Sequence, residues 1–554
     1  MDHHELTSPG DLDRRIIGEL ARGTCRVTLS PALVNTLTTH RQHLLEALSG
    51  DQPVYGVNTG MGAMAGVRLD PEAQQRHQDT LMTGRAVGSA PWLRREEARA
   101  LLATRLRTLL HPAAGVSPAL CQHVIDLLDA DVIPAIPARG SGAAGEIIPL
   151  AHAGAVLLGT GEVLPPAAGR PSPPLPVTAG HDPHGATDAG PALTTTGHNP
   201  HDATDAGSAP TTTGHGSRGT TDAGSAPTAA GNGSRGTTDA GPALAAAGLR
   251  PLSFEAKEGV AFLEGVPGLT GLAILATEHA RTLIAQNMVV AAASHALVRA
   301  NRDPLTVGSP AADALLRLLG DGPVGALQAP VSFRVTAPAL DAALRATAAL
   351  EAAVDRALTE VTDSPAYLDG RFVGTAGFAG TDLAAACGAL TTALVHLADV
   401  GTARLHRLLD PAHTGLPRQL SDTPGAHAGM VTVHKRAAGV AHRLRRFTLP
   451  ALGGTIETSL GQEDVQSFGF EAAECLGEAV GGLRDVLACE LLAVHQARLL
   501  GGEQGGLPGA VAAALNEVAA VLPAGTADRP FGRDLDRLID VLADGWAADL
   551  PGTL

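Results

Sequence analysis

A tandem repeat divides the chain into two parts and limits how much of it can form a core. Four copies of the tetrapeptide Thr-Asp-Ala-Gly recur with a period of 17 residues, beginning at Thr187, Thr204, Thr221 and Thr238. Residues 167–245 contain no Ile, Phe, Tyr, Trp, Met, Lys, Glu or Cys. Units without an apolar face cannot offset the entropy of ordering, so a solenoid is excluded. We interpret residues 167–245 as a disordered insertion between an N-terminal region (1–166) and a C-terminal region (246–554).

Both flanking regions carry apolar residues at helical spacing. The spacing predicts helices over residues 92–110, 118–130, 339–358, 381–409 and 476–500. Alternating strand patterns are few, and only two Trp, two Tyr and nine Phe are present, which predicts an aliphatic core of close-packed helices. We expect a mainly α fold, with a smaller mixed N-terminal region before a long helical bundle and the insertion on a surface loop.

Charge and composition exclude several classes of partner. The formal net charge is −16, whereas nucleic acids and anionic membranes require a basic surface. No uninterrupted apolar run of about 18 residues predicts a membrane span, and the polar, acidic first residues do not resemble a signal peptide. The five cysteines form no CxxC pair, so we expect buried reduced thiols, a cytoplasmic protein and no metal site. Histidine pairs in the repeat (His181/His184, His198/His201) lack nearby Cys or Glu ligands.

Glycine-rich and polar motifs interrupt the helical pattern. They are residues 55–62 (YGVNTGMG), 140–152 (GSGAAGEIIPLAH), 257–265 (KEGVAFLEG) and 461–464 (GQED). Further matches are Gln328 with Ser332 and Arg334, residues 362–365 (TDSP) and residues 415–417 (GLP). In this order and at these distances, the motifs resemble the aromatic amino acid ammonia-lyase and aminomutase family, which includes histidine ammonia-lyase. The resemblance spans residues 55–469, interrupted by the repeat, and implies a helical homotetramer whose active sites draw on three subunits.

The resemblance also implies a cofactor that this sequence cannot make. In the family an internal Ala-Ser-Gly cyclises to a methylidene-imidazolone (MIO), the electrophile that captures the substrate amine. The corresponding residues are Ala143, Ala144 and Gly145, so the serine that supplies the methylene is missing. Ser141, in a second X-Ser-Gly three residues upstream, is interpreted as an unmodified loop serine. We therefore expect no MIO and no other cofactor.

Other positions of the family's active site also differ, so one engineered Ser→Ala change does not account for the sequence. The family's Ser-His-Ala is Gly84-Arg85-Ala86, its Asn-Gly-Thr is Glu264-Gly265-Val266, and its Asn-Phe-His-Gly is Gly377-Phe378-Ala379-Gly380. Its Gln-Tyr pair is His434-Lys435, the tyrosine before its Ser-x-Arg is Val331, and the histidine after its Gln-Glu-Asp is Val465. We interpret these replacements as natural divergence.

Tyr55 corresponds to the family's tyrosine that acts as an acid or base near the reacting carbon. A phenol has an unperturbed pKa near ~10 and needs neighbouring positive charge to act as a base at neutral pH. The resemblance brings Arg85 and Lys435 into the same region, and either would provide that charge. The alternative is that Tyr55 is a packed loop residue.

Arg334 corresponds to the arginine that holds the substrate carboxylate, a task that suits its planar fork of donors. Asn58 would add one hydrogen bond to that carboxylate, as in the family. The other substrate-binding positions that we predict are Gln328, Arg85, Phe378 and His434. A surface or interface ion pair is the alternative for Arg334.

Glu463 corresponds to a family carboxylate near the substrate amine, and Glu264 replaces an amide. Two carboxylates near one site can separate their pKa values, so that one is an acid and the other a base. A salt bridge between Glu264 and Arg85 or Lys435 is the alternative. Lys435 is one of only two lysines, which favours a deprotonable or Schiff-base amine, although a solvated helix lysine fits as well. For the other lysine, Lys257, we expect a structural role.

These observations support three functional hypotheses. The first is a repurposed enzyme that has given up amine elimination through MIO. It would use cofactor-free acid–base chemistry for elimination, isomerisation or cyclisation of a small carboxylate-bearing substrate in bacterial specialised metabolism. The second is a catalytically silent homologue that binds a ligand or a partner subunit. The third is a histidine or aromatic amino acid ammonia-lyase inactivated by a Ser→Ala change at position 144.

Overall fold

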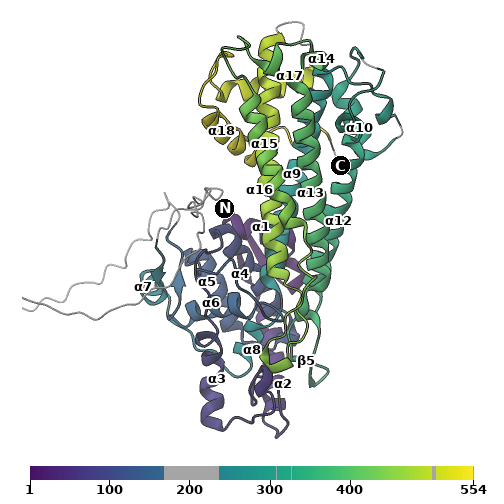
Figure 1. The fold of residues 1–554 in the computed structure, drawn as a ribbon. Coiled ribbons are helices and arrows are strands. Elements are labelled where there is room, and N and C mark those ends of the chain that lie inside the picture. The colour runs from purple at the N-terminus through teal and green to yellow at the C-terminus, as the bar shows by residue number, and fades with distance from the viewer. Residues whose placement is uncertain (167–235, 307, 326, 502–506, 553–554) are drawn as a thin grey trace, which may run out of the picture. The chain divides into compact units, whose positions relative to one another are not determined.

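The computed structural model describes all residues except 167–235, 307, 326, 502–506 and 553–554. Residues 1–166 and 237–554 form one compact unit. Its N-terminal part contains α1 (Arg14–Arg22), α2 (Pro31–Leu48), α3 (Pro71–Thr83), α4 (Arg95–Leu109), α5 (Pro118–Ala130), α6 (Ile147–Leu157), α7 (Ala240–Ala246) and α8 (Glu258–Leu263). The later helices are α9 (Pro267–Leu297), α10 (Pro310–Leu319), α11 (Val331–Arg334), α12 (Thr336–Thr359), α13 (Thr381–Leu408), α14 (Pro411–Thr414), α15 (Val431–Leu444), α16 (Gly469–Gly501), α17 (Gly509–Val521) and α18 (Gly532–Ala543). The predicted mainly α fold is confirmed (Figure 1).

The described strands form three two-stranded sheets. β1 (Asp2–Leu6) pairs in parallel with β2 (Cys25–Leu29), with His4 opposite Val27. β3 (Glu162–Val163) pairs antiparallel with β4 (Thr238–Asp239), and β5 (Ala366–Leu368) with β6 (Arg371–Val373). β1, β2 and β3 lie before the insertion, β4 follows it directly, and β5 and β6 lie between α12 and α13.

Short polar residues before proline begin several helices. Ser30 accepts a hydrogen bond from the Leu33 amide at the start of α2, and Ser117 accepts one from the Leu120 amide at the start of α5. Each serine precedes a proline in the first turn, where the missing N–H costs no hydrogen bond and the fixed φ suits a helix. The predicted bounds of α5 are therefore reproduced at both ends.

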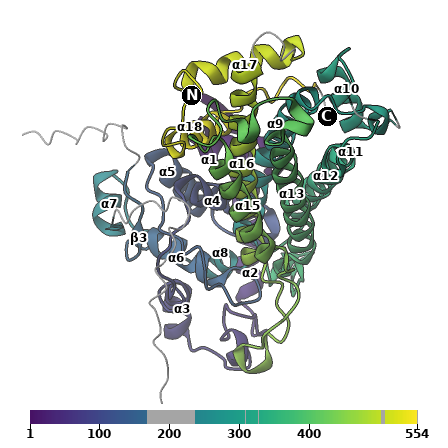
Figure 2. The same cartoon turned by 45° about the horizontal axis from the view of Figure 1, so that its top comes forward.

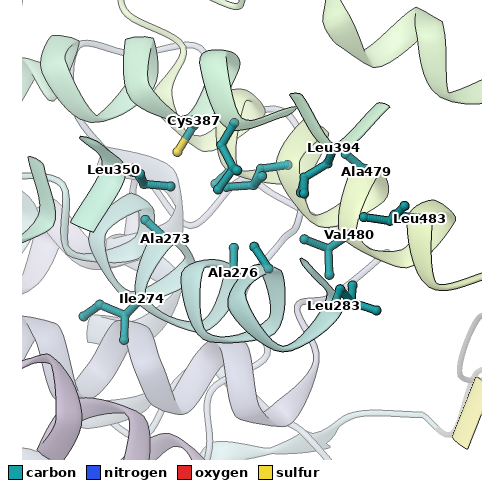
Figure 3. Packing of buried hydrophobic residues seen from close by; sticks show 14 of the residues in the cluster. Ala273, Ile274, Ala276, Leu283, Leu350, Cys387, Leu394, Ala479, Val480 and Leu483 are labelled. Carbon is teal, nitrogen blue, oxygen red and sulfur yellow. The ribbon is translucent and has the colours of Figure 1, made fainter. Parts of the chain in front are cut away.

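The long helices α9, α12, α13 and α16 run alongside one another and form the bundle in Figures 1 and 2. Small side chains such as Ala273, Ala276 and Ala479 alternate in its interior with branched ones such as Leu394 and Leu483 (Figure 3). Because alanines allow helix axes to approach closely, aliphatic side chains fill this interior with few aromatic rings.

A buried polar network ties the four bundle helices together. Arg404 on α13 donates two hydrogen bonds of 2.8 Å to the carboxylate of Glu490 on α16, and both side chains are fully buried. Ser294 on α9 donates to Glu490 at 2.8 Å, and Arg404 also donates to Asn287 on α9 and to Thr336 on α12. A bidentate buried pair whose remaining donors are satisfied fixes the relative positions of the helices.

Two helical stretches, Glu258–Leu297 and Gly377–Leu408, are long and apolar enough to cross a membrane by length and composition alone. Most of the apolar window of each is buried inside the protein, 94% and 56% respectively. Core helices of a bundle meet the same criteria of length and composition, and the burial of α9 and α13 shows that they are core helices here.

The predicted C-terminal limit of the insertion, residue 245, is wrong. Most of residues 167–245 lie outside the described residues, as do the histidine pairs of the repeat. The last copy of the repeat, however, forms β4 and begins α7, where Ala240 and Leu244 are fully buried. Thr238 pairs with Val163, and the Ala240 amide donates to the Gly161 carbonyl at 2.8 Å. The repeat did not reveal where the insertion ends, because its fourth copy begins with the same four residues as the others but continues into an apolar helix.

Cysteine burial differs from the prediction at one position. All five cysteines are free, and four of them are buried, whereas Cys475 is partly exposed.

Candidate active site

The loop that carries Tyr55 is held in place by α3 and α8. Gln78 on α3 donates to the Gly56 carbonyl at 3.0 Å and accepts from the Val260 amide of α8 at 3.2 Å. Gly56 has φ of 67°, and a Cβ there would lie 2.8 Å from a methyl of Val260. Glycine is therefore required, because any larger residue would be strained and would push the loop off α8.

Hydrogen bonds and one close approach between loops join the Tyr55 loop to the residues aligned with the MIO tripeptide. The hydroxyl of Tyr55 accepts a hydrogen bond of 2.8 Å from the Gly62 amide. A Cβ at Gly62 would lie 3.4 Å from the hydroxyl of Ser459, which donates to Glu463 at 2.8 Å. The second oxygen of Glu463 accepts from the backbone amide of Ala144 at 2.7 Å. The structure thus brings Tyr55, Glu463 and Ala144 to one place from three distant parts of the chain.

The loop formed by Ala143, Ala144 and Gly145 also meets the end of α8 and the 3-10 turn η5 (Gly377–Ala379). Gly145 has φ of 89°, and a Cβ on it would lie 3.4 Å from the carbonyl oxygen of Gly265 and 3.5 Å from that of Phe378. Glu264 is the residue before Gly265, at the C-terminal cap of α8. Phe378 and Glu264 are therefore adjacent to the degenerate tripeptide.

Tyr55, Arg85, Glu264 and Glu463 interact electrostatically with one another. Burial raises the pKa of Tyr55, and the negative charges of Glu264 and Glu463 raise it further, whereas Arg85 opposes them. Within one chain the effect of burial and of the two carboxylates therefore outweighs that of Arg85. Because the Gly62 amide donates to the Tyr55 oxygen, the phenol keeps its own proton available for donation.

Glu264 is the most strongly perturbed carboxyl of the group. Burial raises its pKa to about 8, and Asp363 and Glu463 add to the increase, while Lys257 and Arg105 oppose it. Its side chain is 8% exposed, and among the described residues none donates a hydrogen bond to its carboxylate. The predicted salt bridges of Glu264 with Arg85 and with Lys435 are likewise not formed within the described chain. A carboxyl in this state holds a proton at neutral pH and can donate it.

A buried ion pair between Lys257 and Asp363 acts electrostatically on Glu264. Lys257, which has φ of 74°, contacts the carboxylate of Asp363 and donates to the Ala114 carbonyl at 3.2 Å. Arg105 on α4 donates to the carbonyl oxygen of Glu264. Lys257 and Arg105 are fully buried, so the structural role expected for Lys257 agrees with its position.

Asn58 does not present its amide to a ligand. Its side-chain oxygen accepts from the Val54 amide at 2.7 Å and from Arg68 at 3.0 Å, and its nitrogen donates to the Gln52 carbonyl at 2.9 Å. The side chain is buried in its own loop, so the predicted contact with a substrate carboxylate has no support in this geometry.

Four other predicted residues lie on the bundle rather than beside Tyr55. Arg334 at the end of α11 is exposed and donates to Gln328 at 3.4 Å, and α11 contacts α12 and α13. His434 on α15 stacks on His406 with ring centroids 4.7 Å apart, and Lys435, the next residue, is exposed. α15 contacts α13 and α16 and lies well away from α8 (Figure 1). One chain alone does not bring these residues to Tyr55.

Sequence reasoning missed Arg105, Ser459 and the role of Glu146. Glu146 follows Gly145 and accepts hydrogen bonds of 2.5 and 2.6 Å from the first amides of α9, so it fixes the tripeptide loop to the bundle. The sequence did indicate a special role for Arg105, because an arginine inside the apolar stretch 100–106 requires buried partners. No sequence pattern indicated Ser459, because its approach to Gly62 is made by tertiary folding, although its hydrogen bond to Glu463 is local.

The residues at the tripeptide do not fit an MIO. Ala144 has no hydroxyl to lose, and its amide N–H is engaged by Glu463. Cyclisation would convert that nitrogen to a ring imine and remove the N–H that Glu463 accepts. Ser141 is a different case, because its buried hydroxyl makes no hydrogen bond with any described residue.

Solved structures share the fold. Tyrosine aminomutase from Streptomyces globisporus superposes with a TM-score of 0.81 at 22% identity, covering 99% of this chain and 98% of its own. Ergothionase from Treponema denticola, an ergothioneine-degrading enzyme, superposes with a TM-score of 0.80 at 20% identity, covering 99% and 100%. The architecture is that of the helical ammonia-lyases and aminomutases.

Comparison of the sequences identifies the family as well as the fold. The family described as aromatic amino acid lyase matches residues 12–183 and 223–520. Histidine ammonia-lyase from Streptomyces griseus is 30% identical over 536 residues, covering 92% of this chain and 90% of its own. Histidine ammonia-lyase from Streptomyces coelicolor is 29% identical over 501 residues, covering 86% and 84%. The chain belongs to the aromatic amino acid lyase family.

Proposed function

We propose that the protein is an enzyme of this family that works without MIO, by acid–base chemistry on a small carboxylate-bearing substrate. The observation that carries the proposal is the group of Tyr55, Arg85, Glu264 and Glu463 around a tripeptide that cannot cyclise. Replacement of family residues by new ionisable groups, rather than by inert ones, is what a change of chemistry requires.

Each residue of the group has a distinct task. Arg85 is the cation that acts on Tyr55 in the part of the chain that the structure describes, so it binds the substrate carboxylate. Glu463 is held by Ser459 and the Ala144 amide and removes a proton as the base. Glu264, which is protonated at neutral pH, returns a proton to the product or to the leaving group, and Tyr55 donates a hydrogen bond to developing negative charge. Elimination, isomerisation and cyclisation all fit these tasks.

We further propose that the protein is a homotetramer whose neighbouring subunits supply the predicted residues that one chain leaves far away: Gln328, Arg334, His434 and Lys435. Large apolar side chains next to these residues and next to Glu463 are exposed, namely Val331 at 62%, Leu460 at 92% and Val465 at 71%. Exposed apolar residues next to a site indicate a surface that another chain covers.

The experiment that tests the function measures proton exchange. Purified protein is incubated in D₂O with a panel of small carboxylates that includes histidine, tyrosine and phenylalanine, and incorporation of deuterium is followed by NMR. We expect exchange or product with at least one compound. Tyr55→Phe and Glu463→Gln are each expected to lower its rate about 10²–10⁴-fold. Glu457→Gln, which changes an exposed acid of the same loop, should leave it unchanged.

Two outcomes would contradict the proposal. Full activity in Tyr55→Phe and Glu463→Gln would remove the assigned roles. Saturable binding without any exchange would favour the alternative, a catalytically silent homologue that binds a ligand. The losses of side-chain function at Val331, Ala379, Val465 and Ala144 are the observations behind that alternative.

The third hypothesis, a lyase inactivated at position 144, has its own test. We expect Ala144→Ser to gain neither the near-ultraviolet absorbance of MIO nor ammonia release from histidine, because Arg85, Glu264 and Val465 replace other family residues. Intact-mass measurement of both proteins is the direct readout. A loss of two waters in Ala144→Ser, together with lyase activity, would identify an ordinary ammonia-lyase, and the same loss in the unchanged protein would implicate Ser141.

A further inference from the structure

The N-terminal β1–α1–β2 unit brings three metal-binding side chains together, away from the residues assigned to the active site. His4 lies on β1, Glu19 in the last turns of α1 and Cys25 at the start of β2. In the parallel pairing Asp2 is opposite Cys25 and His4 is opposite Val27, so His4 and Cys25 are diagonal neighbours. Alternation along the strands places both on the face that α1 covers.

The donor atoms of these residues converge. His4 Nε2, Glu19 Oε2 and Cys25 Sγ all lie within 4.8 Å of one another. Nε2 and Oε2 are 3.3 Å apart, close enough for an ion pair when His4 is protonated, and both atoms are shielded from solvent. Cys25 Sγ makes a long contact of 4.0 Å with the Ile16 carbonyl oxygen, and its thiol also interacts with the Glu19 carboxylate. The three donors thus face one another.

The separation of His4 and Glu19 matches a metal-binding geometry. Zinc binds imidazole nitrogen and carboxylate oxygen at about 2.0–2.2 Å with tetrahedral angles, which places two such donors about 3.4 Å apart. The observed 3.3 Å is the same within the precision of that calculation. Sulfur binds at about 2.3 Å, so Cys25 needs only a small movement from within 4.8 Å to complete the arrangement.

The surroundings orient the carboxylate for this task. Arg15 donates to Glu19 Oε1 at 2.6 Å, which leaves Oε2 directed at His4. The Glu19 carbonyl accepts from the Thr24 amide at 2.9 Å, so the turn between α1 and β2 is fixed as well. Supporting hydrogen bonds of this kind hold ligands in many metal sites.

We propose that His4, Glu19 and Cys25 bind one Zn²⁺ ion, with water in the fourth position, and that the ion links β1, α1 and β2. One nitrogen, one oxygen and one sulfur donor suit zinc or a similar borderline cation better than Ca²⁺ or Mg²⁺, which require oxygen ligands. The side chains of His4 and Glu19 are 30% and 22% exposed, so the site lies close to the surface, although the donor atoms themselves face inwards. The sequence-based expectation of no metal site does not hold under this proposal.

Cobalt substitution in the full-length protein tests the site. Protein stripped with a chelator is titrated with Co²⁺, whose bond to a thiolate gives a charge-transfer absorption in the near ultraviolet. We expect this band to saturate at one Co²⁺ per chain and to disappear when Zn²⁺ is added. Cys25→Ser should abolish it, and His4→Gln or Glu19→Gln should weaken Co²⁺ binding at least about 10-fold.

Matched controls separate this site from other metal-binding residues. His3→Gln changes the neighbouring exposed histidine of β1, and Cys475→Ser changes the partly exposed cysteine, so both should keep the band. Histidines of the repeat cannot produce it, because residues 167–245 contain no cysteine. Zn²⁺ should also raise the Tm of the stripped protein, and His4→Gln should remove that rise. No thiolate band, or a band that survives Cys25→Ser, overturns the proposal and leaves an ordinary attraction between His4 and Glu19.

Discussion

Replacing Glu264 with glutamine is expected to lower turnover by about 10²–10⁴-fold, the usual contribution of a positioned general acid. Glutamine keeps the size and shape of the side chain but has no acidic proton. Substrate binding should change little, because Arg85, the proposed carboxylate ligand, remains in place. A loss in kcat with nearly unchanged KM therefore distinguishes proton donation from a general disturbance of the pocket.

The pH dependence follows from the direction of the shift. Glu264 must be protonated to act as an acid, and burial raises its pKa from 4.5 to about 8, so kcat/KM should fall as the pH rises through about 8. The same shift affects stability. The folded state holds this proton more tightly than the unfolded state does, so the contribution is fully present below pH 4.5 and is lost as the pH rises to about 8. In Glu264→Gln this part of the stability profile should be flat.

A measurement without substrate checks the protonation state itself. The carbonyl stretch of a neutral carboxylic acid is resolved from that of a carboxylate in the infrared spectrum, so the wild-type protein at neutral pH should show a band that Glu264→Gln lacks. Glu457→Gln is the control, since it removes an exposed carboxylate. A difference spectrum without that band, or an undiminished rate in Glu264→Gln, would show that Glu264 is not the acid.

Local sequence patterns predicted the longest helices of the bundle and α4 and α5, because caps, prolines and apolar spacing act within a few residues. α5, which begins at Pro118 after Ser117, is reproduced at both ends, and the predicted helix 381–409 ends within one residue of α13. The error at residue 245 arose where a strand pair formed across the insertion. Thr238 finds its partner, Val163, far away along the chain, and no local pattern records such a pairing.

The candidate site was predictable only in part. Motif matches selected Tyr55, Glu264 and Glu463, which the fold brings into mutual electrostatic contact. They did not indicate the protonation states, because these depend on burial: Tyr55 becomes a weaker acid rather than a base. Nor did they show that the amide of Asn58 is occupied by its own loop, since that depends on the conformation of the backbone.

The largest loss of stability is expected from Lys257→Met, at about 3–5 kcal/mol. The ammonium of Lys257 contacts Asp363 in the interior, where the two side chains are 0% and 6% exposed. Methionine fills the same volume but leaves Asp363 as a buried charge without its partner, and leaves the Ala114 carbonyl without a donor. Denaturant unfolding, followed by circular dichroism, measures the difference.

The pH dependence of that loss identifies its cause. Burial raises the pKa of Asp363, and removal of Lys257 removes the larger of the two positive charges that oppose the increase, the other being Arg105. An unpaired Asp363 is best accommodated as a neutral acid, so the folded variant retains a proton that the unfolded chain releases. Its stability deficit relative to the wild type should therefore be smallest near pH 4 and should grow as the pH rises towards 7. A packing defect would give a deficit that does not change with pH.

Two further variants complete the test, because the chain has only one other lysine. Lys435 is exposed on α15, so Lys435→Met should change the free energy of unfolding by no more than about 0.5 kcal/mol. The double variant Lys257→Met/Asp363→Leu removes both charges and should recover most of the stability that the single variant loses, because no buried charge is left unpaired. If the double variant were as unstable as Lys257→Met, the loss would lie in the φ of 74° and the packing at position 257 rather than in the ion pair. Recovery would show instead that the Lys257–Asp363 pair is dispensable for folding. The reason for the pair would then be its effect on the pKa of Glu264, which Lys257 lowers and Asp363 raises.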